Sequence, residues 1–229
     1  MMEREIINTE SLDQWQIFNK VYKELDWAKD QSESVSGTGS TLESTESLRE
    51  VLPDICKKYE INNIVDIACG DFNWMKEIVH SFKFYRGVDI VEDLIKENKE
   101  KYSKLDNVEF TVCDVIEDFN SCIADKDFDA IILKDVLVHF PDEYVKKVLD
   151  SLKSSSIKYV FITHFTLIEN NYDIKEFNGW RPQNFTISPW EWDNPIESIF
   201  SPTEKYIWDG KINNDKTLSL WELKKEKDD

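Results

Sequence analysis

Between residues 64 and 163 the chain alternates short apolar segments with longer amphipathic ones. Five segments rich in Val and Ile are predicted strands: 64–67, 85–90, 108–113, 130–134 and 159–163. Patterns typical of helices fall between them, at 74–82, 91–102 and 142–153. Strands that alternate with helices build βαβ units, so the sequence predicts an α/β fold with a doubly wound, mostly parallel sheet and helices on both faces.

Further elements are predicted on either side of this core. Residues 11–29 place apolar side chains at helical spacing with Ser11 as the candidate N-cap, and a second helix is predicted over 42–59, where Pro53 would kink or split it. Near the C-terminus, residues 198–208 and 217–223 are expected to form an antiparallel hairpin at the sheet edge. The chain therefore predicts a single fold with added segments at both ends.

The charge balance restricts the partners of the surface. The chain carries 28 basic and 46 acidic residues, a net charge of -18, and no run of Lys and Arg follows a predicted helix. Binding to nucleic acid or to an anionic membrane needs clustered cations, so neither partner is expected. A local pocket for a small anion stays compatible with this composition.

The cysteines and the N-terminal segment bear on compartment and metal content. Cys56, Cys69, Cys113 and Cys122 show no CxxC spacing and no His companions at ligand intervals, so no metal site is expected. Cys69 and Cys113 are expected to be reduced thiols at strand ends. The first residues are charged and no stretch of about 18 apolar residues occurs, so we expect a cytoplasmic protein.

Ligands of a doubly wound sheet bind outside the carboxyl ends of its strands. Three of these ends carry an aspartate, namely Asp66, Asp89 and Asp114. Asp89 lies about twenty residues beyond the turn at Gly70, where an acidic residue can accept hydrogen bonds from ribose hydroxyls. Asp114 can accept from the exocyclic amine of an adenine while Val115 packs on the ring. The pattern favours an adenosyl ligand over a nicotinamide one.

These motifs resemble the class I S-adenosylmethionine-dependent methyltransferases. The resemblance spans about residues 63–163 and consists of DIACG, GVDI, CDV and FDAIILKDVLVHF in the family's order. SVSGTGST, CGDFNWM, GWRP-N and LWEL are similar to a bacterial group of small methyltransferases that tailor polysaccharides or natural products. The resemblance implies a seven-stranded Rossmann-like sheet, S-adenosyl-L-methionine as cofactor, and one domain over residues 1–229. N-terminal helices with a lid loop would occupy 1–60, and an acceptor-side loop region 165–215.

The resemblance also implies which residues contact the cofactor. They are, in chain order, Asp66, Ala68, Gly70, Trp74, Asp89, Ile90, Asp114, Val115 and Lys134. Asp89 matches the family's ribose ligand and Asp114 its adenine ligand, while Lys134 stands where a backbone carbonyl meets the cofactor's amino group. Phe72 and Ala68 depart from the family pattern D-x-G-x-G-x-G, which has its last glycine at the first of these positions and its first glycine at the second. A turn poor in glycine suits an S-adenosyl ligand, which has no pyrophosphate.

A Ser/Thr/Gly-rich loop covers residues 32–45, between the two predicted N-terminal helices. This position favours a lid whose hydroxyls and amides bind the methionine carboxylate. The lid residues would be Ser36, Gly37, Gly39, Ser40 and Thr41. A flexible linker is the alternative.

Methyl transfer needs an acceptor held in line with the methyl group, and a hydroxyl acceptor also needs a base. Histidine suits that role best. His80 falls within a predicted helix and is expected at the surface, whereas His139 lies four residues past Asp135 and His164 follows the fifth predicted strand. We expect His139 to be the base, oriented by Asp135 and assisted by His164; a structural role for His139 is the alternative.

The Trp-rich segment at 178–195 is expected to bind the acceptor through Trp180, Arg181 and Asn184. Tryptophan faces suit a saccharide, and the guanidinium of Arg181 suits a phosphorylated metabolite, unless it is pinned against Trp180 or an acidic surface. An N-methyltransferase acting on an amine or amidate is the nearest alternative function. An NAD-dependent oxidoreductase would need a GxGxxG turn, which is absent, and a non-catalytic module would show a broken set of strand-end aspartates. We expect a monomer or a homodimer.

Overall fold

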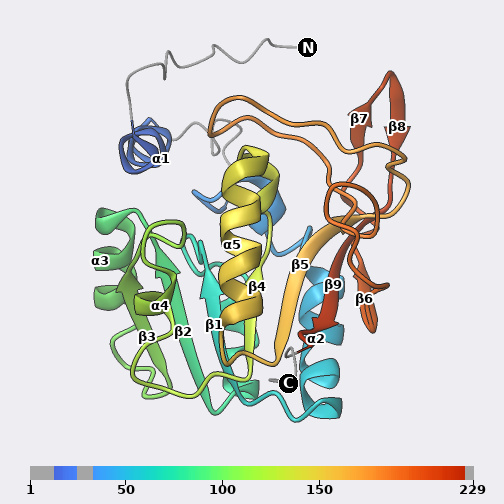
Figure 1. Ribbon diagram of the computed structural model, residues 1–229. Coiled ribbons are helices and arrows are strands. Elements are labelled where there is room, and N and C mark those ends of the chain that lie inside the picture. Colours follow the sequence, from blue (N-terminus) through green and yellow to red (C-terminus); the bar gives the residue numbers. More distant parts are fainter. Residues whose placement is uncertain (1–12, 25–32, 225–229) are drawn as a thin grey trace.

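The computed structural model describes residues 13–24 and 33–224. Its centre is a seven-stranded sheet in the order β3-β2-β1-β4-β5-β9-β6 (Figure 1). The parallel strands are β1 (Asn63–Ile67), β2 (Phe84–Asp89), β3 (Val108–Val112), β4 (Ala130–Leu133) and β5 (Tyr159–Phe165). The antiparallel strands are β6 (Glu197–Phe200) and β9 (Lys216–Glu222). The predicted fold class is confirmed, and the strand order reverses between β1 and β4.

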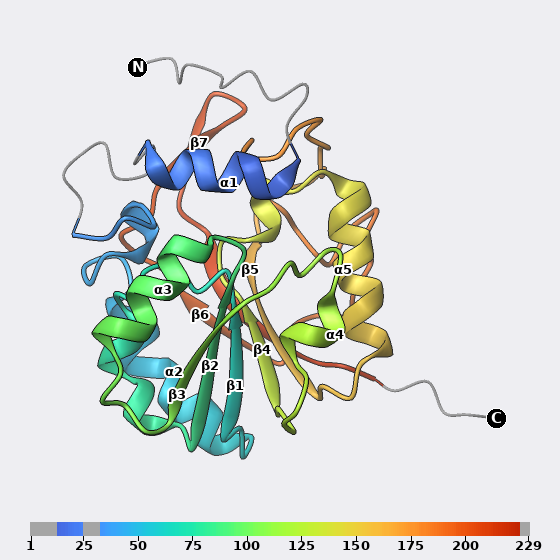
Figure 2. The same cartoon turned by 90° about the vertical axis from the view of Figure 1, so that its left-hand side faces the viewer.

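Helices cover both faces of this sheet, because successive residues of each buried strand point to opposite sides. Ala130 and Ile132 of β4 join one apolar core, and Ile131 and Leu133 join the other. The first core is covered by α2 (Glu46–Lys58) and α3 (Glu92–Lys101), and the second by α4 (Phe119–Cys122) and α5 (Asp142–Ser154) (Figure 2). The strand ends at the carboxyl edge are therefore supported by buried apolar side chains on both faces of the sheet.

The helix α1 (Gln14–Lys23) lies across the carboxyl edge of the sheet in both views (Figure 1, Figure 2). Asp13 is its N-cap. The carboxylate of Asp13 accepts from the backbone amide of Gln16, and the side-chain oxygen of Gln16 accepts from the backbone amide of Asp13. Ser11, the predicted N-cap, lies outside the described residues. Every helix of the described residues is too short or too polar to cross a membrane.

Two predicted helices differ in the structure. Residues 74–82 form two short 3-10 turns, η3 (Met75–Glu77) and η4 (Val79–Ser81). The side-chain amide of Asn107 donates to the carbonyls of Val79 and Phe82, which takes these acceptors out of a helical ladder. The helix α2 continues through Pro53, held by buried Leu48, Leu52 and Ile55.

The C-terminal edge is antiparallel, as predicted, but its pairing differs in detail. The strand β9 lies between β5 and β6, with Thr163 opposite Leu218 and Ile199 opposite the same residue on the other side. The intervening segment forms a separate hairpin of β7 (Tyr206–Trp208) and β8 (Lys211–Asn213). Its turn is Asp209-Gly210, both with positive φ, as a two-residue hairpin turn requires. This hairpin projects beyond the carboxyl edge (Figure 1).

Candidate functional site

A cavity of about 960 Å³ opens at the carboxyl edge of the sheet. It lies where the strand order reverses between β1 and β4, the usual ligand position in this architecture. Its size is at the upper end of the range for ligand pockets, which leaves room for a cofactor together with a small second ligand. The cavity is covered by α1 through Gln14, Phe18 and Tyr22.

The structure brings most of the predicted cofactor residues to this cavity. Those that line it are Ser36, Gly37, Ser40, Ala68, Gly70, Asp89, Ile90, Asp114, Val115 and Lys134, together with Gly39 of the lid loop. Three predicted residues do not line it. Thr41 turns its hydroxyl to the carbonyl of Thr38, Trp74 is buried in the core beneath the turn, and Asp66 is buried in β1.

The turn after β1 is shaped by residues in the left-handed conformation. Ala68, Gly70 and Phe72 have φ values of 57°, 58° and 59°. A Cβ on Gly70 would lie 2.1 Å from Oγ of Ser36, so only glycine fits beneath the lid loop (residues 36–41). Phe72 is fully buried and packs against Tyr85, so its side chain points away from the cavity. Although Phe72 replaces the usual glycine, its side chain therefore does not fill the cavity beside the turn.

Asp71 attaches the chain just before the lid loop to this turn. Its carboxylate accepts from the hydroxyl of Ser34 at 3.0 Å and from the amide of Val35 at 2.9 Å. The amide of Asp71 in turn donates to Oγ of Ser36 at 3.0 Å. Sequence reasoning did not select Asp71, although its place directly after Gly70, the only glycine of this turn, was a signal for it.

Asp89 fixes the same turn from the neighbouring strand. Its Oδ2 accepts from the amide of Gly70 at 3.1 Å, and its Oδ1 accepts from the amide of Val91 at 3.0 Å. Burial raises the pKa of Asp89 above its usual value, while these backbone bonds act against the shift. The carbonyl of Gly70 is held at 2.8 Å by the side-chain amide of Asn98 from α3. The carboxylate of Asp89 is therefore held rigidly at the cavity wall.

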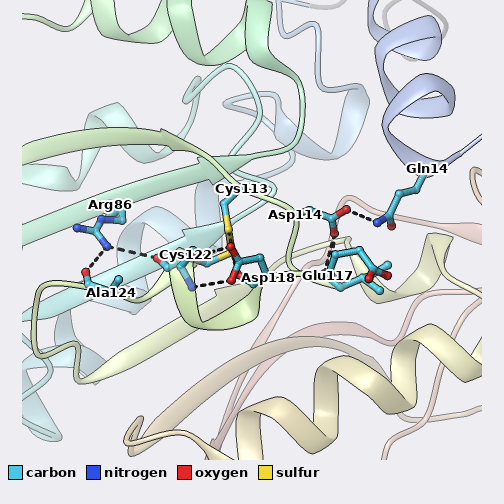
Figure 3. Close-up of a disulfide and its surroundings, with 10 residues drawn as sticks. Gln14, Arg86, Cys113, Asp114, Glu117, Asp118, Cys122 and Ala124 are labelled. Atoms are coloured by element: carbon cyan, nitrogen blue, oxygen red, sulfur yellow. Dashed lines mark hydrogen bonds between the residues drawn. A yellow bond between two sulfur atoms is a disulfide. The ribbon is translucent and has the colours of Figure 1, made fainter.

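Both carboxylate oxygens of Asp114 accept hydrogen bonds from the protein itself. Its Oδ1 accepts from the amides of Ile116 and Glu117 at 2.8 and 3.1 Å, and its Oδ2 accepts from the side-chain amide of Gln14 (Figure 3). Gln14 belongs to α1, so this bond fastens the covering helix to the end of β3. An adenine amine at Asp114 would need the oxygen that Gln14 now occupies.

The expectation that Cys113 is a reduced thiol is wrong. Cys113 and Cys122 form a disulfide that joins the end of β3 to α4, with Cα atoms 5.7 Å apart (Figure 3). The turn through Asp118 brings the two cysteines together, a proximity that their nine-residue separation does not reveal. Cys69 is a free, buried thiol, as expected. Disulfides are uncommon in the reducing cytosol, so the cytoplasmic location stays a prediction.

Asp135 is the centre of a charge cluster formed by Lys134, Asp135, Glu204 and Lys216. Its Oδ2 binds the ammonium groups of Lys134 at 2.6 Å and Lys216 at 2.8 Å. Its Oδ1 accepts from the hydroxyl of Thr163 at 3.1 Å. Burial acts to raise the pKa of Asp135, but the two lysines outweigh it and hold that pKa well below its usual range. Asp135 itself has a φ of 59°, a strained backbone position at the cavity wall.

His139 lines the cavity from η5 (Leu137–His139), but Gly179 rather than Asp135 holds its Nδ1. The distance from Nδ1 to the carbonyl oxygen of Gly179 is 2.7 Å. A carbonyl only accepts, so Nδ1 carries the hydrogen and Nε2 is the basic nitrogen of the neutral ring. Asp135, the residue expected to orient His139, is bonded through its carboxylate to Lys134, Lys216 and Thr163.

His164 does not lie in the cavity. The strand β5 runs to Phe165, so His164 is inside the strand rather than after it, and it is 2% exposed. Its Nδ1 accepts from the amide of Phe185 at 3.2 Å, and burial lowers its pKa to about 4. Its predicted role beside His139 is wrong, because the alternation along β5 turns Phe165 to the cavity instead.

Of the three predicted acceptor residues, only Trp180 lines the cavity. Arg181 is fully buried, ion-paired with Asp142 at the start of α5, and 3.4 Å from the carbonyl oxygen of Val138. Asn184 is also buried, with its amide donating to the carbonyl of Ile168 at 3.0 Å. Both residues fasten the Trp-rich segment to the body of the protein, so their predicted contacts with an acceptor are wrong.

An aromatic wall made of Phe165, Trp180 and Tyr206 faces the cavity beside the charge cluster. The ring centres of Phe165 and Tyr206 are 5.0 Å apart, and those of Trp180 and Tyr206 are 5.6 Å apart. The hydroxyl of Tyr206 donates to Asp215; burial and this bond raise its pKa well above the usual range. Tyr206 therefore contributes a ring face and no titrating group.

Sequence reasoning missed Glu204, Tyr206 and Lys216. Glu204 lies in the connection between β6 and β7 and Tyr206 begins β7, and the predicted strand over 198–208 gave no sign that either residue faces a cavity. Lys216 had a signal: it opens the last strand, and the first residue of an antiparallel strand lies at the carboxyl edge of its parallel neighbours. No group of three His, Cys, Asp or Glu side chains within the described residues is placed to hold a metal ion.

Asp66 predicts an unusual dependence of stability on pH. Burial raises its pKa to about 7, while the hydroxyl of Tyr85, 2.9 Å away, and Lys134 act against the shift. The native state thus keeps a proton that the unfolded chain loses near pH 4, so stability falls as pH rises from about 4 to about 7. Relative to the wild type, the unfolding free energy of Asp66→Asn should gain about 3 kcal/mol as the pH rises from 5 to 8. Urea unfolding of both proteins at these pH values measures the gain, and parallel pH profiles would contradict it.

The comparisons with known proteins agree with this geometry. Residues 64–155 match a methyltransferase domain family. Magnesium protoporphyrin IX methyltransferase from Synechocystis PCC 6803, solved with bound SAM, superposes with a TM-score of 0.55 at 15% identity, over 92% of this chain and 97% of that one. The PH0226 protein from Pyrococcus horikoshii OT3 superposes with a TM-score of 0.51 at 20% identity, over 78% of this chain and 90% of that one. No curated protein matches the sequence. At these identities the solved structures establish the fold.

Proposed function

Because the chain belongs to the class I, S-adenosylmethionine-dependent methyltransferases through its domain over residues 64–155, we propose that it methylates a hydroxyl group of a small polar acceptor. The observation that carries the proposal is a single cavity whose two sides differ in chemistry. One side is formed by strand-end aspartates and a glycine turn, and the other by aromatic rings and His139. The lid over this cavity would come from residues 1–60 and the acceptor side from residues 165–215 of one domain.

The residues at the first side fit an S-adenosyl ligand. Asp89 and Asp114 close adjacent strands, and both line the cavity. A Cβ at Gly70 would collide with Ser36, so the turn keeps its backbone open toward the ligand. In this proposal Asp89 binds the ribose hydroxyls, Asp114 the adenine amine after Gln14 turns away, and the lid loop the methionine carboxylate. When bound, the cofactor supplies a methyl group already activated by its sulfonium.

The second side supports an uncharged saccharide as the acceptor. The aromatic wall offers ring faces to the apolar face of a sugar. The prediction of a phosphorylated acceptor depended on Arg181, which is buried in its ion pair with Asp142. The two cations at the cavity floor, Lys134 and Lys216, are already paired with Asp135 and Glu204. An anionic acceptor therefore finds little uncompensated charge in this part of the cavity.

The chain's own residues then have two tasks. The aromatic wall and the covering helix α1 hold the acceptor and exclude water, so that binding also orients the acceptor hydroxyl toward the methyl group. His139, held at Nδ1 by Gly179, presents Nε2 as the base that takes the hydroxyl proton. Asp135 contributes by fixing the floor of the cavity and does not titrate near neutral pH.

Calorimetry with S-adenosylhomocysteine and with NAD tests the donor half of the proposal. We expect micromolar binding of S-adenosylhomocysteine and no measurable binding of NAD, because the turn after β1 lacks the glycines that a pyrophosphate needs. Micromolar binding of NAD alone would establish the oxidoreductase instead. Binding of neither would favour a module without a cofactor, although Asp89 and Asp114 are intact.

A further inference from the structure

Four carboxylates line the cavity, and one of them is incompletely bonded. Asp89, Asp114 and Asp135 each accept hydrogen bonds at both oxygens. Glu204 differs: its Oε1 is bound by Lys216 at 2.8 Å, while its Oε2 is buried and has no hydrogen-bond partner in the described part of the chain. A buried charged oxygen without a donor is costly, so the atom points to a donor that a ligand provides.

The lid loop passes directly over this carboxylate. A Cβ on Gly39 would lie 3.1 Å from Oε1 of Glu204 and 3.0 Å from Oδ2 of Asp135. The carbonyl of Gly39 also accepts from Nζ of Lys134 at 2.8 Å. A side chain at this position would press on both carboxylates, so glycine lets the loop lie close to the charge cluster. Glu204 is therefore next to the loop to which the methionine carboxylate has been assigned.

The charges of the cluster indicate which ligand group belongs at Oε2. Two lysines balance Asp135 and Glu204, and the carboxylates hold the pKa of Lys216 above its usual value although burial acts to lower it. The atom of the cluster without a hydrogen bond, Oε2 of Glu204, is thus an acceptor in a neutral, partly desolvated setting. A cationic donor satisfies such an oxygen best, because charge-assisted bonds are about twice as strong as neutral ones.

Building on the proposed function, we propose that Oε2 of Glu204 accepts a hydrogen bond from the α-ammonium group of bound S-adenosylmethionine. Lys216 positions the carboxylate by holding Oε1. The zwitterionic end of the cofactor is then divided between two elements far apart in the sequence, with the carboxylate at the lid loop and the ammonium at Glu204. Glu204 is in this way a cofactor-binding residue contributed by the segment between β6 and β7.

Three ligands and one substitution test this assignment by calorimetry. The ligands are S-adenosylhomocysteine, its analogue with hydrogen in place of the amino group, and 5′-methylthioadenosine, which lacks the amino-acid portion. The wild type should bind S-adenosylhomocysteine at least about tenfold more tightly than the desamino analogue. Glu204→Gln should lose most of that preference and bind 5′-methylthioadenosine as the wild type does. The cycle isolates the contact between Glu204 and the amino group.

Glu143→Gln is the matched control, since it removes one negative charge from an exposed position outside the cavity. It should keep the wild-type preference. A Glu204→Gln protein that keeps the full preference overturns the proposal. If that variant also loses 5′-methylthioadenosine, Glu204→Ala takes its place in the cycle with the same expected loss. A wild type that binds none of the three ligands refutes the proposed function itself, a separate outcome.

Discussion

His139→Ala is expected to reduce methyl transfer to a hydroxyl acceptor by about 100- to 10,000-fold while leaving the affinity for S-adenosylhomocysteine unchanged. The reason is geometric: His139 lines the cavity, and Gly179 fixes its Nδ1 so that Nε2 is the basic atom. The acceptor is found first by screening small polar molecules for formation of S-adenosylhomocysteine. Steady-state rates of wild type and variant with that acceptor then give the loss.

His80→Ala serves as the control for this experiment. His80 is exposed on η4, outside the cavity, so its replacement should leave the rate within about twofold. A His139→Ala protein that keeps most of its rate would remove the base from the mechanism. That result would favour the N-methyltransferase alternative, because the lone pair of a neutral amine attacks without prior loss of a proton.

The parallel core of the fold was predictable because each buried strand is a short apolar run bounded by polar residues. Ile131 and Leu133 face one core while Ala130 and Ile132 face the other, so the whole strand must be apolar. The segment at 74–82 could not be predicted in the same way. Its apolar spacing suits a helix, but Asn107, distant in sequence, binds its carbonyls and limits it to two turns.

The donor side of the site was predictable for a similar reason. A residue at the carboxyl end of a parallel strand lies at the edge of the sheet where ligands bind. Asp89, Asp114 and Lys134 could therefore be placed on the cavity wall from local patterns alone. Residues on irregular segments have no such constraint. Arg181 looked suited to an anion, but its burial depends on Asp142, which begins a helix 39 residues earlier in the chain.

The acceptor side depends on how the chain ends, which local patterns do not encode. Lys216 and Glu204 meet Asp135 only because β9 returns antiparallel beside β5. Likewise, His164 was placed after a strand that in the structure runs two residues further. Because the strand continues past residue 163, His164 is subject to its alternation and faces the core, while its neighbour Phe165 faces the cavity.

Asp89→Ala should weaken the binding of S-adenosylhomocysteine by about 100-fold or more, as expected for the loss of two charge-assisted hydrogen bonds to the ribose. The substitution also leaves the amides of Gly70 and Val91 without their acceptor, so the turn after β1 loses its fixed position. Asp89→Asn keeps one acceptor oxygen and the side-chain volume. It should therefore fall between alanine and the wild type when all three are compared by calorimetry.

Asp129→Ala separates loss of the ligand contact from general loss of stability. Oδ2 of Asp129 accepts from the amides of Asn62 and Asn63 at 2.7 and 2.8 Å, so Asp129, like Asp89, holds two backbone amides, but at the opposite edge of the sheet. It should lower the midpoint of thermal unfolding and leave the affinity for S-adenosylhomocysteine within about threefold of the wild type. Both variants remove one carboxylate that holds two backbone amides, and of the two only Asp89 lines the cavity. If Asp89→Ala behaved in the same way as Asp129→Ala, Asp89 would be a structural cap of the turn and the ribose would bind elsewhere.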